Sequence, residues 1–164
     1  ILPLTIIYLL LLPLFSFILP INQLYFNHRF TIREIYYIWG TALLSMVLII
    51  NLILKSMWGR ARPEDILELG GKEVFTPWYK ISDNCHENCS FVSGDASVGF
   101  SLIALYFVIK HKLYFWASIT LGSALGFVRI MEGGHFLSDV IMSGIIVIAC
   151  YYVAYKYLLL KKDA

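Results

Sequence analysis

Charge is scarce in this sequence. Asp, Glu, Lys and Arg make up only 15% of its 164 residues, and 59% are hydrophobic, whereas soluble domains carry about a quarter charged residues. The net charge is +2, and no block of basic residues is interleaved with aromatics, so nucleic acid is not expected as a partner. Repeats and low-complexity tracts are also lacking. The composition is therefore typical of a protein whose main partner is the lipid bilayer.

A signal peptide is lacking as well. No basic segment precedes the first apolar stretch, Ile1–Pro20, and no small-x-small cleavage site follows it, so this stretch is predicted to be a mature spanning helix. Pro13 inside it predicts a kink that neighbouring helices can accommodate. Because the chain begins with isoleucine, we expect its N-terminus to be truncated.

Apolar segments recur along the chain at about the 20 residues that a helix needs to cross the hydrocarbon core. The expected fold class is all-α, a polytopic integral membrane bundle that forms one domain over residues 1–164. The third segment is short, and two glycines weaken its start. The five predicted spanning helices are roughly Ile1–Pro20, Tyr36–Leu54, Ser93–Ile109, Leu113–Met131 and Phe136–Leu160.

The connections between these helices differ in charge. Residues 22–35 and 110–112, with the C-terminal tail, are expected on one side of the membrane, and residues 56–92 and 132–135 on the other. Counting residues at the helix ends, the first side has seven Lys and Arg against two acidic residues, and the second has six against nine. Short cytoplasmic loops are enriched in Lys and Arg. Three of the six on the second side, Lys55, Arg62 and Arg129, are assigned below to a functional site, so the second side is poor in other basic residues and is predicted to be periplasmic or exterior.

Two of the three cysteines lie in the long loop on that second side. A disulfide between Cys85 and Cys89 is allowed in an oxidising compartment. A zinc site that includes His86 is an alternative, although the spacing is not that of a standard finger and no second ligand pair is in view. Two free thiols are the third possibility. Cys150 lies in a spanning helix and is expected to serve only packing.

Several ionisable residues lie at predicted helix ends on the second side. Such residues are costly at membrane depth and are usually functional. They come from different helices, yet the alternation of the helices brings them to one membrane face. They are Lys55, Asp95, Arg129, His135 and Asp139. Their convergence predicts a functional site.

The spacing of these residues forms three short patterns. Lys55 begins K-x6-R-P, which ends in Arg62-Pro63; Val92-Ser93-Gly94-Asp95 sits at a helix start; and Arg129 begins R-x5-H-x3-D. The patterns occur in order within segments 55–63, 92–97 and 129–139. Together they resemble the type 2 phosphatidic acid phosphatase superfamily, which shares its site with acid phosphatases and vanadium haloperoxidases. That family usually has six spanning helices, so the first would be missing here.

The second pattern narrows the resemblance. Most members of the family have P-S-G-H, whereas this chain has C-S-F-V-S-G-D from Cys89 to Asp95. The C-S-F-V-S-G form is similar to bacterial lipid A 4′-phosphatases. In the family the last position is a His that protonates the leaving oxygen, so the resemblance makes Asp95 a candidate general acid. An aspartic acid can serve only while it is protonated. Three outcomes stay open: Asp95 is the acid, another group such as His86 or Glu132 serves, or the enzyme is slow.

The third pattern carries the expected nucleophile. His135 and Asp139 are four residues apart at a helix start, so they share a face. A carboxylate bonded to one imidazole nitrogen fixes the tautomer and leaves the other nitrogen free to attack. The resemblance implies that His135 forms a phosphohistidine intermediate that water hydrolyses, with no cofactor and no metal.

The remaining site residues are expected to bind phosphate. Fixed cations and backbone donors stabilise a phosphoryl group during transfer. Arg60 would only flank the site or bind lipid headgroups. The expected phosphate-binding residues are Lys55, Arg62, Ser93, Gly94 and Arg129, with Ser93 and Gly94 offering the N–H groups of a helix start.

The favoured function is a metal-independent lipid phosphatase in the bacterial inner (plasma) membrane, acting at the extracytoplasmic face on the 4′-phosphate of lipid A. A phosphatase for polyprenyl (undecaprenyl) diphosphate, phosphatidic acid or phosphatidylglycerol phosphate is the alternative. A diphosphate releases phosphate, a better leaving group than an alkoxide, which suits a site without the usual acid His. A non-catalytic relative that binds phospholipid headgroups is the second alternative.

Overall fold

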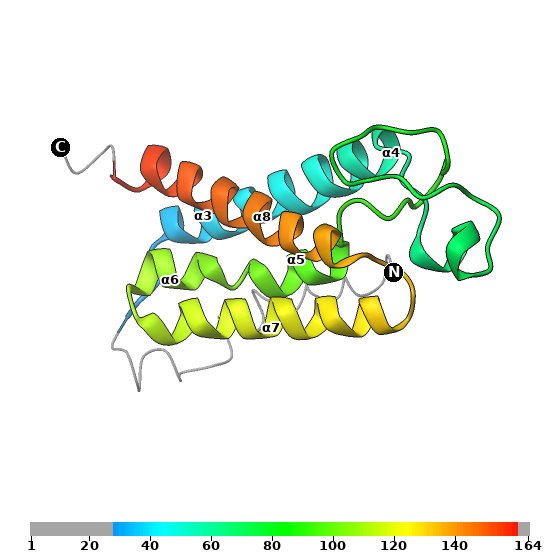
Figure 1. The fold of residues 1–164 in the computed structure, drawn as a ribbon. Coiled ribbons are helices and arrows are strands. Elements are labelled where there is room, and N and C mark those ends of the chain that lie inside the picture. Colours follow the sequence, from blue (N-terminus) through cyan, green and yellow to red (C-terminus); the bar gives the residue numbers. More distant parts are fainter. Residues whose placement is uncertain (1–27, 161–164) are drawn as a thin grey trace.

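The computed structural model describes residues 28–160 (Figure 1). The predicted spanning helix Ile1–Pro20 lies outside the described residues. The described part is helical and has no β-strand, which confirms the all-α fold class. Its elements are α3 (Ile32–Ala42), η1 (Leu43–Leu54), α4 (Lys55–Met57), η2 (Pro63–Asp65), η3 (Leu67–Leu69), α5 (Gly94–Phe100), α6 (Ile103–Ile109), α7 (Lys112–Met131) and α8 (Leu137–Leu158).

Three helical stretches in the described part are long and apolar enough to cross a membrane. α3, η1 and α4 join into one stretch of 26 residues, and α7 and α8 have 20 and 22 residues. α5 and α6 together form a shorter apolar helix, Gly94–Ile109, which is interrupted between Phe100 and Ile103. The four helices expected in this part of the chain are therefore present. The number that crosses the bilayer stays a prediction.

The start of α3 shows how the sequence sets a helix boundary. Thr31 Oγ1 accepts a hydrogen bond from the Glu34 N–H at 3.3 Å, and Glu34 Oε2 accepts one from the Thr31 N–H at 2.7 Å. This reciprocal capping satisfies two N–H groups near the start of the helix. From this fixed start the chain continues as η1, a stretch of π-helix, and reaches Lys55 at its end. The capped helical stretch thus ends near Lys55, the first of the predicted site residues.

Glycines let α5, α7 and α8 approach one another closely. A Cβ at Gly99 would lie 2.5 Å from Gly122 Cα, and one at Gly126 would lie 2.3 Å from a methyl group of Val140. Small residues at such crossings are common where membrane helices pack. Figure 1 shows α5 and α6 running alongside α7, with α8 packed across them. The start of α5, the end of α7 and the start of α8 therefore meet at one end of the bundle.

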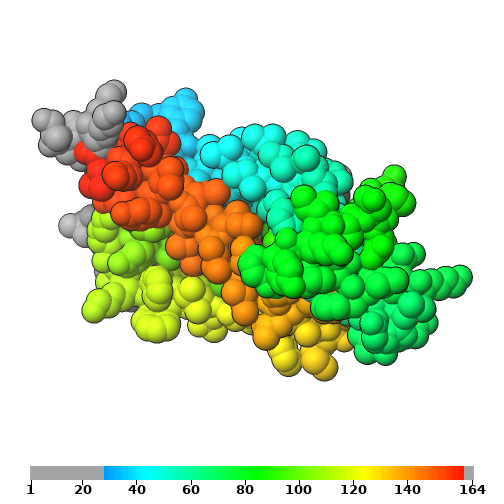
Figure 2. All heavy atoms as spheres, turned by 45° about the horizontal axis from the view of Figure 1, so that its top comes forward, coloured from blue at the N-terminus to red at the C-terminus, as the bar shows by residue number. Residues whose placement is uncertain are grey.

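Residues 58–93 fold over this end of the bundle, where they form the green part of Figures 1 and 2. The Trp58 ring stacks on Phe91 with centroids 4.5 Å apart, and Ser82 Oγ donates to the Gly59 carbonyl at 2.7 Å. Gly59 has a φ of +61°, and a Cβ there would lie 1.6 Å from Ser82 O, so the turn requires glycine. These contacts fold the segment onto itself, and the Glu64 N–H, which donates to the Gly133 carbonyl at 3.1 Å, joins it to the connection between α7 and α8.

Candidate active site

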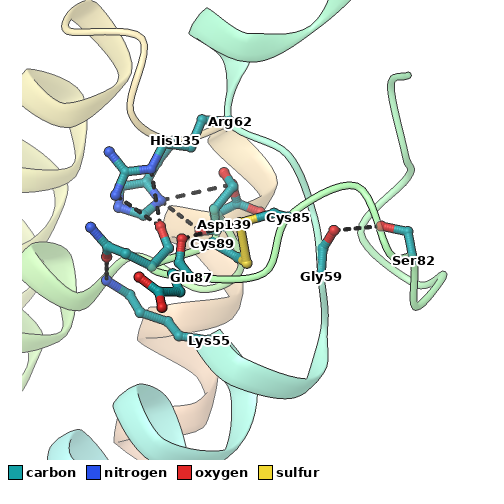
Figure 3. The surroundings of a disulfide bond; sticks show 11 residues. Lys55, Gly59, Arg62, Ser82, Cys85, Glu87, Cys89, His135 and Asp139 are labelled. Carbon is teal, nitrogen blue, oxygen red and sulfur yellow. Dashed lines mark hydrogen bonds and ion pairs between the residues drawn. A yellow bond between two sulfur atoms is a disulfide. The ribbon is translucent and has the colours of Figure 1, made fainter. Parts of the chain in front are cut away.

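The structure gathers the predicted site residues from four separate elements. Lys55 lies near the end of the helical stretch Ile32–Met57, Asp95 lies in the first turn of α5, and Arg129 lies in the last turn of α7. Asp139 lies in the first turn of α8, and His135 comes just before that helix. Figure 3 shows Lys55 and Arg62 beside His135 and Asp139, around the loop that contains the disulfide. The convergence expected from helix alternation is therefore present in the fold.

His135 is buried, with 1% of its surface exposed, and its ring is held by the main chain. Its Nδ1 lies 2.6 Å from the Ser90 carbonyl oxygen and 4.0 Å from Asp139 Oδ2. A carbonyl oxygen can only accept a hydrogen bond, so Nδ1 must carry the proton and Nε2 must keep its lone pair. The direct carboxylate–imidazole bond expected from the spacing is replaced by a main-chain bond that gives the same tautomer.

The surroundings of His135 also keep its ring neutral. Burial and the neighbouring cations, Lys55 first among them, lower the pKa of His135 from 6.5 to about 3, although the bond to the Ser90 carbonyl opposes this. At neutral pH the ring is therefore uncharged. An uncharged imidazole with a free Nε2 lone pair has the chemical state that a nucleophile requires.

Asp139 is fully buried and its two carboxylate oxygens have separate partners. Oδ1 pairs with the Arg60 guanidinium. Oδ2 accepts hydrogen bonds from Ser90 Oγ at 2.6 Å and from the Phe136 N–H at 2.9 Å. Asp139 therefore contacts His135 chiefly through Ser90, which donates to the carboxylate with its side chain and accepts from the imidazole with its carbonyl.

Arg60 is an integral part of this network, and the expectation that it only flanks the site or binds headgroups is wrong. Its exposed fraction is 2%, and its Nε donates to the Thr76 carbonyl at 2.8 Å. The guanidinium lies 4.1 Å from the centroid of the Phe136 ring, in a cation–π contact. Burial lowers the pKa of Arg60, and the Asp139 carboxylate opposes this by stabilising the charged form. Arg60 thus balances the buried charge of Asp139.

Lys55 and Arg62, the two cations of the first pattern, share one partner. Lys55 Nζ donates to Asn88 Oδ1 at 3.3 Å. Arg62 donates to the Asn88 main-chain carbonyl from Nε at 3.1 Å and from Nη2 at 2.9 Å. Lys55 is buried, whereas Arg62 is partly exposed and lies 3.6 Å from Glu64. The two cations are thus held side by side by one uncharged residue.

Arg129, the third cation, is held by two carboxylates. Its Nε lies 3.0 Å from Asp95 Oδ2, and its Nη1 pairs with Glu132. Asp95 thus occupies the position of the family's acid histidine as a partner of Arg129, and Glu132 is half exposed to solvent at the edge. Two of the three candidates for proton donation, Asp95 and Glu132 but not His86, are therefore paired with the same guanidinium in the structure.

Ser93 and Gly94 start α5 beside Lys55. Ser93 Oγ accepts from the Ala96 N–H at 3.4 Å and caps the helix, and the Ser93 side chain is fully buried. A Cβ at Gly94 would lie 3.4 Å from Lys55 Nζ, which is ordinary contact. The Ser93 hydroxyl is therefore engaged in capping, and Gly94 is the residue of this pair that borders the cation.

Cys85 and Cys89 form a disulfide in the structure, and Cys150 is free. With the two sulfurs bonded to each other, the zinc alternative with His86 loses its thiolate ligands. No group of three or more possible metal ligands occurs within residues 28–160. The loop between the two cysteines contains Asn88, the partner of Lys55 and Arg62.

Three functional contacts were missed from the sequence, namely those of Arg60, Asn88 and Ser90. The position of Arg60 could have predicted a partner. It lies between Lys55 and Arg62 near a helix end, where a buried charge is costly unless it is paired. The contacts of Asn88 with Arg62 and of Ser90 with His135 are made by main-chain carbonyls. Every residue type has such a carbonyl, so the residue identity gives no signal of the contact.

Comparison with known proteins identifies the family of the chain. The family model described as PAP2 superfamily matches residues 34–163. The lipid A 4′-phosphatase of Francisella tularensis subsp. novicida is 42% identical over 120 residues, which cover 71% of this chain and 54% of that protein. The lipid A 4′-phosphatase of Rhizobium leguminosarum is 38% identical over 106 residues, with 63% and 46% covered.

A third relative with the same printed name, from Rhizobium etli, is 39% identical over 106 residues, which cover 62% of this chain and 40% of that protein. The chain spans about half the length of the curated relatives it matches. No solved structure matches it. The matched region of the family model includes all three patterns around the candidate site.

Proposed function

Because the chain belongs to the PAP2 superfamily, we propose that it is a membrane phosphatase that hydrolyses a lipid phosphate monoester, with the 4′-phosphate of lipid A as the favoured substrate. The observation that carries this proposal is a buried, neutral His135 beside three cations, Lys55, Arg62 and Arg129. The names of the three relatives support the choice of substrate.

In the proposed first step, His135 Nε2 attacks the phosphorus atom. A P–N bond forms as the P–O bond to the lipid breaks, and the leaving oxygen takes up a proton to become a hydroxyl. In the second step water attacks the phosphohistidine, the P–N bond breaks and inorganic phosphate leaves. Two displacements replace one difficult displacement, which is the gain of covalent catalysis.

The three cations would stabilise the charge that spreads over the equatorial oxygens during both steps. Lys55 is buried, so its charge acts on the phosphate with little screening by water. The planar guanidinium groups of Arg62 and Arg129 can each offer two parallel N–H donors to phosphate oxygens. This scheme assigns no step to a metal ion.

Asp95 is the proposed proton donor to the leaving oxygen. Its carboxylate pairs with Arg129 at 3.0 Å, and an arriving phosphate dianion would compete for the same guanidinium. Once displaced and next to an anion, a carboxylate binds a proton more readily. Glu132 shares Arg129 and is the alternative donor.

The proposed location is the bacterial inner membrane, with the site facing the periplasm or exterior. The apolar helices and the bacterial relatives support a membrane protein. Seven Lys and Arg lie on the opposite side against six on this side, and three of the six, Lys55, Arg62 and Arg129, belong to the site, which supports the orientation. A disulfide next to the site is consistent with an oxidising compartment.

Dephosphorylation of a polyprenyl diphosphate is the second candidate. The Asp95–Arg129 pair favours it, because a phosphate leaving group needs less help from an acid than an alkoxide does. Asp95→Asn separates the two functions. A lipid A phosphatase that uses Asp95 as its acid loses kcat, by about 10²-fold or more, whereas a diphosphatase is expected to keep most of it.

The direct test measures phosphate release in membranes with EDTA present, from lipid A, phosphatidic acid and undecaprenyl diphosphate. Wild type is expected to act best on lipid A, and His135→Ala is expected to be inactive on all three. His111→Asn is the matched control, because His111 caps the start of α7 with its side chain and Asn is a good N-cap. If wild type is silent on all three lipids, or His135→Ala matches wild type, headgroup binding replaces the enzymatic proposal.

A further inference from the structure

The disulfide closes a short loop, Cys85–Cys89, beside the candidate site (Figure 3). Cys89 is fully buried, whereas Asn88 before it is exposed to solvent. The two chain neighbours of Cys89 are the residues that contact the site. Asn88 faces the cations and Ser90 faces the nucleophile. The cross-linked residue therefore lies between the two contacts.

Asn88 is the joint acceptor for two cations. Its side-chain oxygen accepts from Lys55 Nζ, and its carbonyl accepts twice from Arg62. The residue has a φ of +51°, a left-handed conformation that Asn adopts more readily than most residues. That conformation turns the carbonyl and the side chain towards the two cations at the same time.

These bonds leave donors for a substrate. A guanidinium has five N–H donors and an ammonium has three. Arg62 uses two of them on Asn88 and Lys55 uses one. Asn88 therefore fixes the direction of both side chains while most of their N–H groups stay available to a phosphate dianion.

Ser90 makes the matching contact with the nucleophile. Its carbonyl accepts from His135 Nδ1 at 2.6 Å, and its Oγ donates to Asp139 at 2.6 Å. Its N–H donates to the Arg60 carbonyl at 2.9 Å. The tripeptide 88–90 thus joins the anion-binding cations to the imidazole through a single rigid stretch of main chain.

We propose that the disulfide loop is the positioning element of the phosphate site, with Asn88 as the positioning residue for Lys55 and Arg62. The inference rests on the proposed phosphatase function. Because Asn88 and Ser90 flank the bonded Cys89, the disulfide sets the cations relative to His135. Reduction frees Cys89 from Cys85, so the cations and the imidazole lose their common alignment. The intact disulfide is required for tight phosphate binding and fast transfer.

The test compares oxidised and reduced full chain in detergent micelles. Dissociation constants for inorganic phosphate and orthovanadate are measured by calorimetry, and phosphate release from lipid A is measured in parallel. Reduction is expected to weaken anion binding by about tenfold, the worth of one charge-assisted hydrogen bond. It is expected to lower kcat by about a hundredfold, because small misplacements of reacting groups have effects of that size.

Three variants make the result specific. Cys85→Ser/Cys89→Ser should behave like the reduced protein and no longer respond to reductant. Cys150→Ser removes the free thiol of α8, and it should bind phosphate as wild type does and keep its sensitivity to reductant. Asn88→Gly keeps the carbonyl bond to Arg62 and the left-handed conformation but removes the contact with Lys55. It should weaken phosphate binding by roughly fivefold with the disulfide intact.

Equal phosphate affinity and equal kcat before and after reduction would overturn the proposal. A lower melting temperature of the reduced protein with unchanged affinity and kcat would overturn it too, because the disulfide would then serve stability alone. Failure of the proposed function gives a different result. An oxidised wild type that releases no phosphate contradicts the phosphatase assignment, while its affinity for orthovanadate, oxidised against reduced, still decides whether the loop positions the cations.

Discussion

The two halves of the candidate site hold their charges in different ways. In the nucleophile half, Arg60, Asp139 and His135 are all buried, and each has a protein partner. In the phosphate half, Arg129 is partly exposed, and its partner Glu132 is half exposed to solvent. One half is therefore a closed network, and the other half has partners that can be exchanged.

The difference corresponds to what each half would do in catalysis. A nucleophile needs one tautomer and one direction of attack, and a dry network of hydrogen bonds fixes both. Cations that receive a phosphate must release their resting partners first, which costs little when those partners are solvated. The proposed mechanism therefore needs both an Arg129 that can exchange its carboxylate partners for phosphate and a His135 ring that stays fixed.

The largest effect is expected in the closed half. Asp139→Leu leaves Arg60 as an uncompensated buried charge, which should lower the free energy of unfolding by about 3–5 kcal/mol. Denaturant unfolding in detergent measures this. Arg60→Met/Asp139→Leu removes both charges and should regain much of the stability, because apolar replacement of a whole buried pair is often neutral. Full activity in that double variant would contradict the role of the network in positioning Ser90 and His135.

The next effect is expected at Arg129, and it concerns activity. Arg129→Ala should lower kcat/KM by about 10²–10³-fold, the usual loss when one donor to a developing charge is removed. The melting temperature should fall less than for Asp139→Leu, because Glu132 is half exposed and Asp95 keeps 16% of its side chain exposed, whereas Arg60 is buried. Arg129→Lys keeps the charge but loses the planar guanidinium, so its kcat/KM should lie between the values for wild type and Arg129→Ala. If Arg129→Ala unfolds as readily as Asp139→Leu, the proposed difference between the two halves is wrong.

Acid pH should lower the stability of the folded chain through the buried His135. The pKa of His135 is about 3 in the folded chain, below its ordinary value of about 6.5 in the unfolded chain. Between these values the unfolded chain binds the extra proton, so the contribution of His135 to stability is complete above about pH 6.5 and is lost as pH falls towards 3. Unfolding of wild type and His135→Gln across this range should show the flatter profile for the variant.

The smallest effect is expected at Glu132. Glu132→Gln removes one exposed partner of Arg129, and such pairs contribute about 0–1 kcal/mol to stability. Phosphate should bind slightly more tightly, because one competing carboxylate is gone. A calorimetric comparison with wild type measures this. A large loss of kcat would instead identify Glu132 as the proton donor in place of Asp95.

The sequence predicted the helices of the described part and the convergence of their charged ends, because apolar length and alternation are properties of residue order. It also predicted Lys55 and Arg129 as site residues from their spacing, and in the structure both lie near enough to His135 for their charges to act on its ring. It could not predict that Ser90, rather than Asp139, accepts the proton of His135 Nδ1, because that contact depends on the path of the loop. The role of Arg60 was missed because its burial depends on Thr76 and Phe136, which lie far from it in the chain.

The central claim is that His135 is the nucleophile, and trapping the phosphoenzyme tests it most directly. Wild type and His135→Ala would be mixed with lipid A, quenched in base within the first turnover and digested for mass spectrometry. We predict one phosphate on the peptide that contains His135 in wild type, stable in base and lost in acid, and none in His135→Ala. Phosphate on a different residue, or rapid turnover with no phosphopeptide at any quench time, would contradict the claim.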